Sequence, residues 1–169
     1  MVRQFKNLML NQYLNFRLNY FRSNEDLCDY SAKIGTVKKI LLILPAECKD
    51  KTEYRNFING LNKIFQKAKI STFQIKDLRL HEQNWLGVPN ESYLDELRSQ
   101  NFDLIIDLNN EPDKICAYIC ALSEAPLRIN LISGPYDHAY NLYFSSEQEK
   151  SPEERHQLIL SNLTKLKLI

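Results

Sequence analysis

The chain has 169 residues, of which 44% are hydrophobic and 25% charged, and its formal net charge is +1. This length suits a single domain with a sizeable core, and the near-zero net charge excludes a general attraction to nucleic acid. The four glycines are scattered, so that neither a Walker-type loop nor a G-x-G-x-x-G nucleotide-binding motif is present. No cofactor is therefore expected.

The compartment is indicated by segments that the sequence lacks. No apolar segment approaches the roughly 20 residues that cross a bilayer, and the first residues lack the uninterrupted apolar core of a secretory signal. The four cysteines, Cys28, Cys48, Cys116 and Cys120, are then expected to be reduced thiols. We expect a cytoplasmic protein.

Residues 3–22 have the pattern of a basic amphipathic helix. Their large apolar side chains recur at spacings of three and four, at Phe5, Met9, Tyr13, Phe16 and Tyr20. The same segment contains four basic residues and no acidic one: Arg3, Lys6, Arg17 and Arg22. This combination is typical of a helix that binds a partner or a membrane surface. The alternative is that the stripe covers the core or a dimer interface.

Short apolar runs alternate with helical patterns in the rest of the chain. Residues 23–26 form a helix-start signal, after which a short helix or connector leads to Gly35. Strands are predicted at 38–45, 71–75, 102–108, 128–132 and 140–144, and helices at 51–67, 91–100, 111–122 and 151–167. Residues 85–89 predict a strand or only a turn.

This order of elements predicts an α/β fold. We expect a single Rossmann-like domain over residues 36–169, with a mostly parallel sheet and helices on both faces. Residues 1–35 would precede it as the basic amphipathic helix and its connector.

Candidate ligand-binding residues follow the predicted strands. In an open parallel sheet, ligands bind in the crevice beyond the carboxyl ends of the strands. Loops 45–50, 107–113 and 132–138 would meet there and supply Glu47, Asp50, Asp107, Glu111, Asp113, Asp137 and His138. A carboxylate near a histidine can act as a general base or bind a divalent cation. The alternative is that these acids cap helices and satisfy loop amides.

Two cysteines and a histidine have simpler interpretations. Cys116 and Cys120 share a face of a predicted helix, but no second pair completes a four-ligand set, so that no metal is expected and burial is predicted. His156 lies among charged residues of the last predicted helix and is expected to be solvated.

Three of these segments carry a family resemblance: KILLIL at 39–44, FDLIIDL at 102–108 and ALSEAPLRI at 121–129. In that order they resemble the N-terminal half of bacterial family 9 glycosyltransferases, the lipopolysaccharide heptosyltransferases. The chain looks still closer to short uncharacterised bacterial proteins that have a basic N-terminal helix and a lone Rossmann-like domain.

The resemblance implies a role for one residue. Those enzymes have a Gly-Asp in the loop after the first strand, and its Asp is thought to be the catalytic base. Counting from KILLIL places Asp50 there, with Lys49 in place of the glycine. The second domain, which holds the nucleotide sugar in that family, has no counterpart here. We therefore expect a non-enzymatic interaction module that binds a protein partner or associates with itself through the N-terminal helix. The alternative is a sugar- or nucleotide-binding domain, or a glycosyltransferase-like enzyme that acts as an oligomer or with a partner.

Overall fold

A five-stranded parallel sheet forms the centre of the molecule. The structure is a computed structural model that describes residues 2–22, 29–48, 50–144 and 151–168. The strands are β1 (Lys39–Ile43), β2 (Lys69–Phe73), β3 (Leu104–Asp107), β4 (Leu127–Asn130) and β5 (Leu142–Tyr143). Their order is β2-β1-β3-β4-β5, and every neighbouring pair is parallel. The chain thus runs from β1 out to one edge and then returns past β1 to build the other side.

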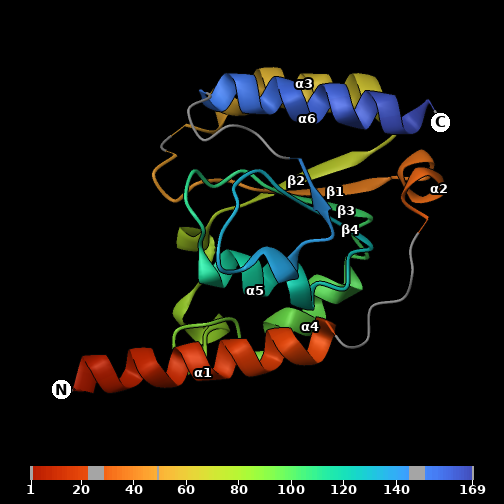
Figure 1. Cartoon of the computed structure of the whole chain (residues 1–169). Coiled ribbons are helices and arrows are strands. Elements are labelled where there is room, and N and C mark those ends of the chain that lie inside the picture. Colours follow the sequence, from red (N-terminus) through yellow and green to blue (C-terminus); the bar gives the residue numbers. More distant parts are fainter. Residues whose placement is uncertain (1, 23–28, 49, 145–150, 169) are drawn as a thin grey trace.

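Helices cover both faces of this sheet (Figure 1). One face carries α2 (Tyr30–Gly35), α3 (Arg55–Ile64) and α6 (Pro152–Lys167), and the other carries α4 (Glu91–Ser99) and α5 (Lys114–Leu122). The first helix, α1 (Val2–Arg22), forms a further layer outside α4 and α5. Short 3-10 helices lie in the connections: η1 (Lys51–Tyr54), η2 (Ile75–Asp77), η3 (Leu80–Glu82) and η4 (Asp137–Ala139).

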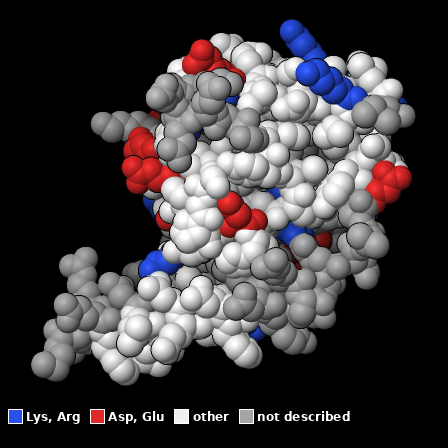
Figure 2. Space-filling view, in the orientation of Figure 1, with Lys and Arg blue, Asp and Glu red and all other residues white. Residues whose placement is uncertain are grey.

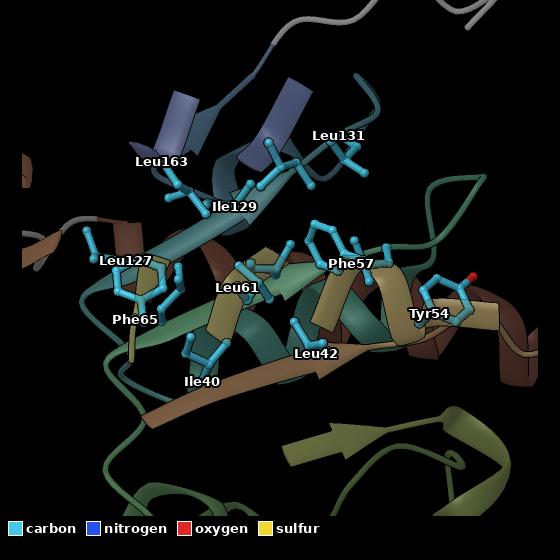
Figure 3. Close-up of a cluster of buried hydrophobic side chains, with 14 of the residues drawn as sticks. Ile40, Leu42, Tyr54, Phe57, Leu61, Phe65, Leu127, Ile129, Leu131 and Leu163 are labelled. Atoms are coloured by element: carbon cyan, nitrogen blue, oxygen red, sulfur yellow. The ribbon is translucent and has the colours of Figure 1, made fainter. Parts of the chain in front are cut away.

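The apolar runs of the central strands supply both cores. Side chains of a strand point to alternate faces, so Ile40 and Leu42 of β1 pack with α3 and α6, whereas Leu41 and Ile43 pack with α4 and α5. Figure 3 shows the first of these clusters, in which residues of η1, α3 and α6 meet those of β1 and β4. Since both faces are covered, the strands are continuously apolar rather than alternating. The predicted α/β fold is confirmed.

The first helix is anchored on its own domain. Leu10 and Leu14 are buried against a cluster that includes Leu94 of α4 and Tyr118 of α5. At the edges of this contact, the hydroxyls of Tyr13 and Tyr118 are 3.2 Å apart, and Arg17 is paired with Glu91 at 2.7 Å.

The buried face of α1 is not the predicted stripe. That stripe was expected to centre on aromatic residues, of which Phe5 and Phe16 are exposed in the structure. Leu10 and Leu14 lie one turn apart on a different face, where their smaller side chains fit closely over α4 and α5. The helix was predicted correctly; of its predicted stripe, Met9 and Tyr13 pack against the domain, whereas Phe5 and Phe16 are exposed.

Other differences concern the ends of elements. The second strand begins at Lys69, before the predicted start, and the helix after β1 opens with the 3-10 turn η1. The helix after β3 begins at Lys114, because Asp113 caps it. In residues 85–89 a turn leads to a single antiparallel bridge between Gln83 and Pro89. The predicted helix start at 23–26 lies outside the described residues.

Candidate functional site

The strand order places a crevice between the loops that follow β1 and β3. The chain leaves β1 towards β2 on one side, and β3 lies on its other side. In doubly wound sheets the ligand site lies at such a reversal, beyond the carboxyl ends of the strands. Glu47 follows β1, and Asn109, Asn110 and Glu111 follow β3, so that these four residues flank the crevice.

Two adjoining depressions form this crevice. One of about 320 Å³ is lined by Ala46, Glu47, Asn109, Asn110, Glu111, Pro112 and Asp113. The other, of about 270 Å³, is lined by Asn110, Glu111, Pro112, Leu131, Ile132, Ser133, Tyr143 and Arg155. Asn110 links their two sides, because its Oδ1 accepts from Arg155 at 3.0 Å and its Nδ2 donates to Glu47 at 3.4 Å.

Asp107, at the end of β3, is buried beneath the crevice. Its Oδ2 accepts a hydrogen bond of 2.5 Å from the Tyr140 hydroxyl, and its Oδ1 accepts from the backbone and side-chain nitrogens of Asn109 at 3.0 and 2.7 Å. Burial raises the pKa of Asp107, and burial likewise raises the pKa of Tyr140. A carboxyl group that is enclosed and fully hydrogen-bonded suits a structural role, in which it joins β3 to the segment before β5.

Three further acids hold local turns. Asp50 caps η1 and accepts from the hydroxyl of Thr52 at 2.5 Å and from its backbone N–H at 2.8 Å. These two hydrogen bonds lower the pKa of Asp50, which makes it a weaker base than an ordinary aspartate. Asp113 accepts from two N–H groups at the start of α5, and Asp137 accepts from Ser133 and the N–H of Gly134.

The structure brings together only part of the predicted set. Glu47 and Glu111 line the larger depression. Asp107, Glu111 and Asp137 surround a hollow of about 10 Å³, which is at most the size of one water molecule. Neither Asp50 nor His138 lines any of these three spaces. His138 lies in η4, which packs against α1 and α5.

Two arginines shape the crevice and were not predicted as site residues. Arg155 comes from α6 and lies 45 positions from Asn110 in the sequence. Arg128 of β4 is buried, which lowers the pKa of its guanidinium, and it donates to the carbonyls of Ala125 and Ala139 at 2.7 and 2.8 Å. It therefore fixes the loop that carries Tyr140 to Asp107. No local pattern in the sequence places either arginine at this edge.

The thiols have an apolar environment. Cys48, Cys116 and Cys120 are buried and free, and burial raises the pKa of each. The predicted burial of Cys116 and Cys120 is confirmed. Cys28 lies outside the described residues.

The described residues contain neither a metal-binding cluster nor a membrane-spanning helix. Within residues 2–22, 29–48, 50–144 and 151–168, no group of three or more His, Cys, Asp or Glu side chains is placed to hold a metal ion. In the same part of the chain, no helix combines the length and the apolar character needed to cross a membrane.

Comparison with known proteins identifies a family. A family model described as a family of unknown function (DUF6913) matches residues 6–165. The chain belongs to this family. Neither the curated proteins nor the solved structures compared with the chain gave a match. The family match begins within α1 and ends within α6, so that both outer helices belong to the region that defines this DUF6913 protein.

Proposed function

We propose that this protein is a non-enzymatic interaction module that docks on its partner through the outer face of α1. The observation that carries the proposal is the exposure of three large apolar side chains, Phe5 (63%), Leu8 (57%) and Phe16 (71%). We call these three residues the α1 outer face. They recur with Gln12 at steps of three, four and four, so they form one stripe along the helix.

The inner face of α1 holds the helix on the domain, which leaves the outer face available for binding. Leu10 and Leu14 already anchor α1 on the domain, so that the outer face is not needed to hold the helix in place. Single exposed apolar residues are normal, whereas a contiguous exposed stripe is typical of an interaction site. The anchored helix presents this stripe in a fixed position, which limits the ordering cost of binding.

The crevice supports the non-enzymatic part of the proposal. Asp50, which the resemblance to family 9 glycosyltransferases makes the base, is a helix cap with a lowered pKa. Asp107 is enclosed and joined to Tyr140. A general base needs access to its substrate and a pKa near the working pH. Asp50 is exposed but its pKa is lowered, and the pKa of Asp107 is raised but its carboxyl group is enclosed, so neither acid meets both requirements. A relative of the acceptor-side domain without transferase activity therefore suits the geometry best.

The test compares the cellular assembly of the protein with that of two variants. In the first variant, Phe5, Leu8 and Phe16 are replaced by serine. In the matched control, the exposed polar residue Asn15 of the same helix is replaced by serine. We expect the wild type and the control to sediment from native cell extracts with a complex or a membrane fraction, and the first variant to sediment as the 19.9 kDa chain. A wild type that sediments alone would overturn the proposal.

A second candidate function is favoured by the two depressions. Their lining offers amide, carboxylate and guanidinium groups from three segments, with Asn110 bonded to both Glu47 and Arg155. Such groups can bind a sugar or the sugar part of a nucleotide, in a binding domain or in a glycosyltransferase-like enzyme completed by another chain. A thermal-shift screen with nucleotides, nucleotide sugars and phosphosugars tests it. A ligand at a hundredfold excess over its Kd should stabilise the fold by about 2.7 kcal/mol, and Glu111→Gln should reduce that shift.

A further inference from the structure

We propose that the partner of the α1 outer face is an anionic lipid bilayer, on whose surface α1 lies flat. This inference rests on the proposed function and names the occupant of the same surface. It follows from the distribution of exposed apolar side chains, from the charge of α1 and from the place of the helix in the fold.

Exposed apolar side chains are concentrated at one end of the molecule. Among the described residues, seven large hydrophobic side chains are exposed, and three of them form the α1 outer face. Two more, Leu80 (88%) and Trp85 (64%), lie in the segment next to α1. Leu86 and Val88 of that segment pack in the same cluster as Leu10 and Leu14 of α1. The end of the molecule that carries α1 therefore has five of the seven.

The residue types fit the boundary of a bilayer. Phenylalanine, tryptophan and leucine are the side chains that interfacial helices and loops bury between headgroups and acyl chains. Phe5, Phe16 and Trp85 are exposed, and none of them lines the depressions described above. A fluid lipid surface accommodates projecting side chains, whereas a protein partner has to match their shape.

The charge of α1 complements anionic headgroups. The helix contains four basic residues and no acidic one, although the net charge of the whole chain is only +1. Arg17 is ion-paired with Glu91, and the helix itself supplies no acid for the other three. Lys6 is exposed and lies between the outer face and the anchored face of α1. Among the described side chains that Figure 2 shows at the lower left, where α1 runs, none is acidic. A second copy of α1 would bring like charges together, so charge favours an anionic surface over self-association.

The position of α1 allows the whole helix to reach a flat surface. Its 21 residues make it about 30 Å long, and it is the outermost layer of the fold (Figure 1). Leu10 and Leu14 attach its inner face to the domain, so the domain would stand on the bilayer with α1 beneath it. Electrostatic attraction and shallow apolar insertion would then act together, which is the usual basis of reversible interfacial binding.

The experiment measures binding of the purified full chain to vesicles. One set of vesicles contains phosphatidylcholine alone, and the other contains equal amounts of phosphatidylcholine and phosphatidylglycerol. We expect cosedimentation to be at least about tenfold stronger with the anionic vesicles and to fall at high salt. Trp85 is the single tryptophan of the chain, so a blue shift of its fluorescence reports insertion next to α1.

Variants assign the binding to its two components. Replacing Phe5, Leu8 and Phe16 by serine should abolish cosedimentation, and Lys6→Gln should weaken it and reduce its salt dependence. The matched control is Leu168→Ser, since Leu168 is an exposed large hydrophobic residue at the end of α6, on the opposite side of the sheet from α1. This control should bind like the wild type. Circular dichroism and urea unfolding of every variant show that the fold is retained.

The outcomes separate this inference from the proposed function. If the serine variant loses the cellular assembly but the purified wild type ignores anionic vesicles, the interaction module stands and the lipid partner is overturned in favour of a protein. Equal binding to both kinds of vesicle would overturn the charge argument. Formation of a dimer that the serine variant disrupts would make a second copy the occupant. If the wild type forms no assembly and binds no vesicle, both proposals fail.

Discussion

The crevice and the α1 outer face differ in whether their characteristic groups are already engaged. At the crevice, the acids predicted to be chemically active largely serve the fold: Asp50 caps η1, Asp113 caps α5, and Asp107 is enclosed with Tyr140. On α1, the apolar side chains of Phe5, Leu8 and Phe16 contribute little to the core of the domain. A group with no role in stabilising the fold is the better candidate for function, because nothing else in the molecule explains its exposure.

The comparison also shows why residue type alone misleads. Carboxylates after parallel strands are expected at binding sites, yet the same position offers free N–H groups at helix starts that carboxylates satisfy equally well. Apolar residues on a helix are expected to be core, yet α1 has apolar residues on two faces and only one of them can face the domain. In both regions, the contacts of a residue, and not its type, show whether it stabilises the fold or is available for binding.

The largest effect should come from the inner face of α1. Leu14→Ala should destabilise the docked helix by about 3 kcal/mol, because a fully buried leucine leaves a cavity. The matched change Phe16→Ala, two residues away on the exposed side, should change stability by less than about 0.5 kcal/mol. Urea unfolding and protease cleavage within α1 measure both. Equal losses in the two variants would break the distinction between the faces.

A smaller loss is expected beneath the crevice. Asp107→Ala removes the acceptor of the Tyr140 hydroxyl and of Asn109, which should cost about 2 kcal/mol of unfolding free energy. Asp107→Asn should cost less, because the amide can accept from Asn109 and donate to the hydroxyl oxygen of Tyr140. Since burial raises the pKa of Asp107, ionisation at higher pH destabilises the wild type, and the Asn variant should lose that dependence.

The test of Asp107 is equilibrium unfolding as a function of pH from 3.8 upward, where the unfolded chain has lost a proton that the folded chain retains. An Ala variant as stable as the wild type would show that Asp107 has no structural role. The crevice would then regain an acid available for ligand binding, and the contrast with α1 would weaken.

Acidification tests the helix that borders the crevice. His156 of α6 was expected to be solvated, but it packs against Tyr54 and Phe57 with ring centroids 5.4 and 4.8 Å away, and burial lowers its pKa from 6.5 to about 4. Between these two values the unfolded chain binds a proton that the folded chain does not. Neutral His156 therefore makes its full contribution to the free energy of unfolding above pH 6.5, and the free energy should fall by about 1–2 kcal/mol as the pH approaches 4.

The measurement is the unfolding free energy as a function of pH. His156→Phe should remove this component of the dependence, whereas His81→Gln, a change at an exposed position on η3, should retain it. An unchanged pH profile in His156→Phe would show that other groups are responsible.

The smallest effect concerns a helix cap at the crevice. Asp113→Ala should cost about 1 kcal/mol, because the N–H groups of Ile115 and Cys116 lose their acceptor. Asp113→Asn should restore most of it. The midpoints of urea unfolding test both changes, provided that the dependence of the unfolding free energy on urea concentration is the same in each variant. An Ala variant as stable as the wild type would mean that water replaces the cap without loss of stability.

The sequence predicted those features that depend on neighbouring residues. The run at 104–106 and KILLIL had to be buried on both faces, and the helix predicted at 91–100 begins at Glu91 as expected. The orientation of α1 could not be predicted, because both Leu10–Leu14 and Phe5–Phe16 follow helical spacing. The link between Asn110 and Arg155 was also invisible, since 45 positions separate them and no local pattern joins them.

The docking site of α1 has a consequence for synthesis. The helix leaves the ribosome before its docking site does, because Tyr13 contacts Tyr118, which lies 105 positions later. At roughly 5–20 residues per second, about 5–20 s pass before this site exists. During that interval both apolar faces of the nascent helix are uncovered, so a chaperone or a nearby bilayer can capture it before the domain does. The order of translation therefore leaves α1 accessible to other binding partners until residue 118 has been made.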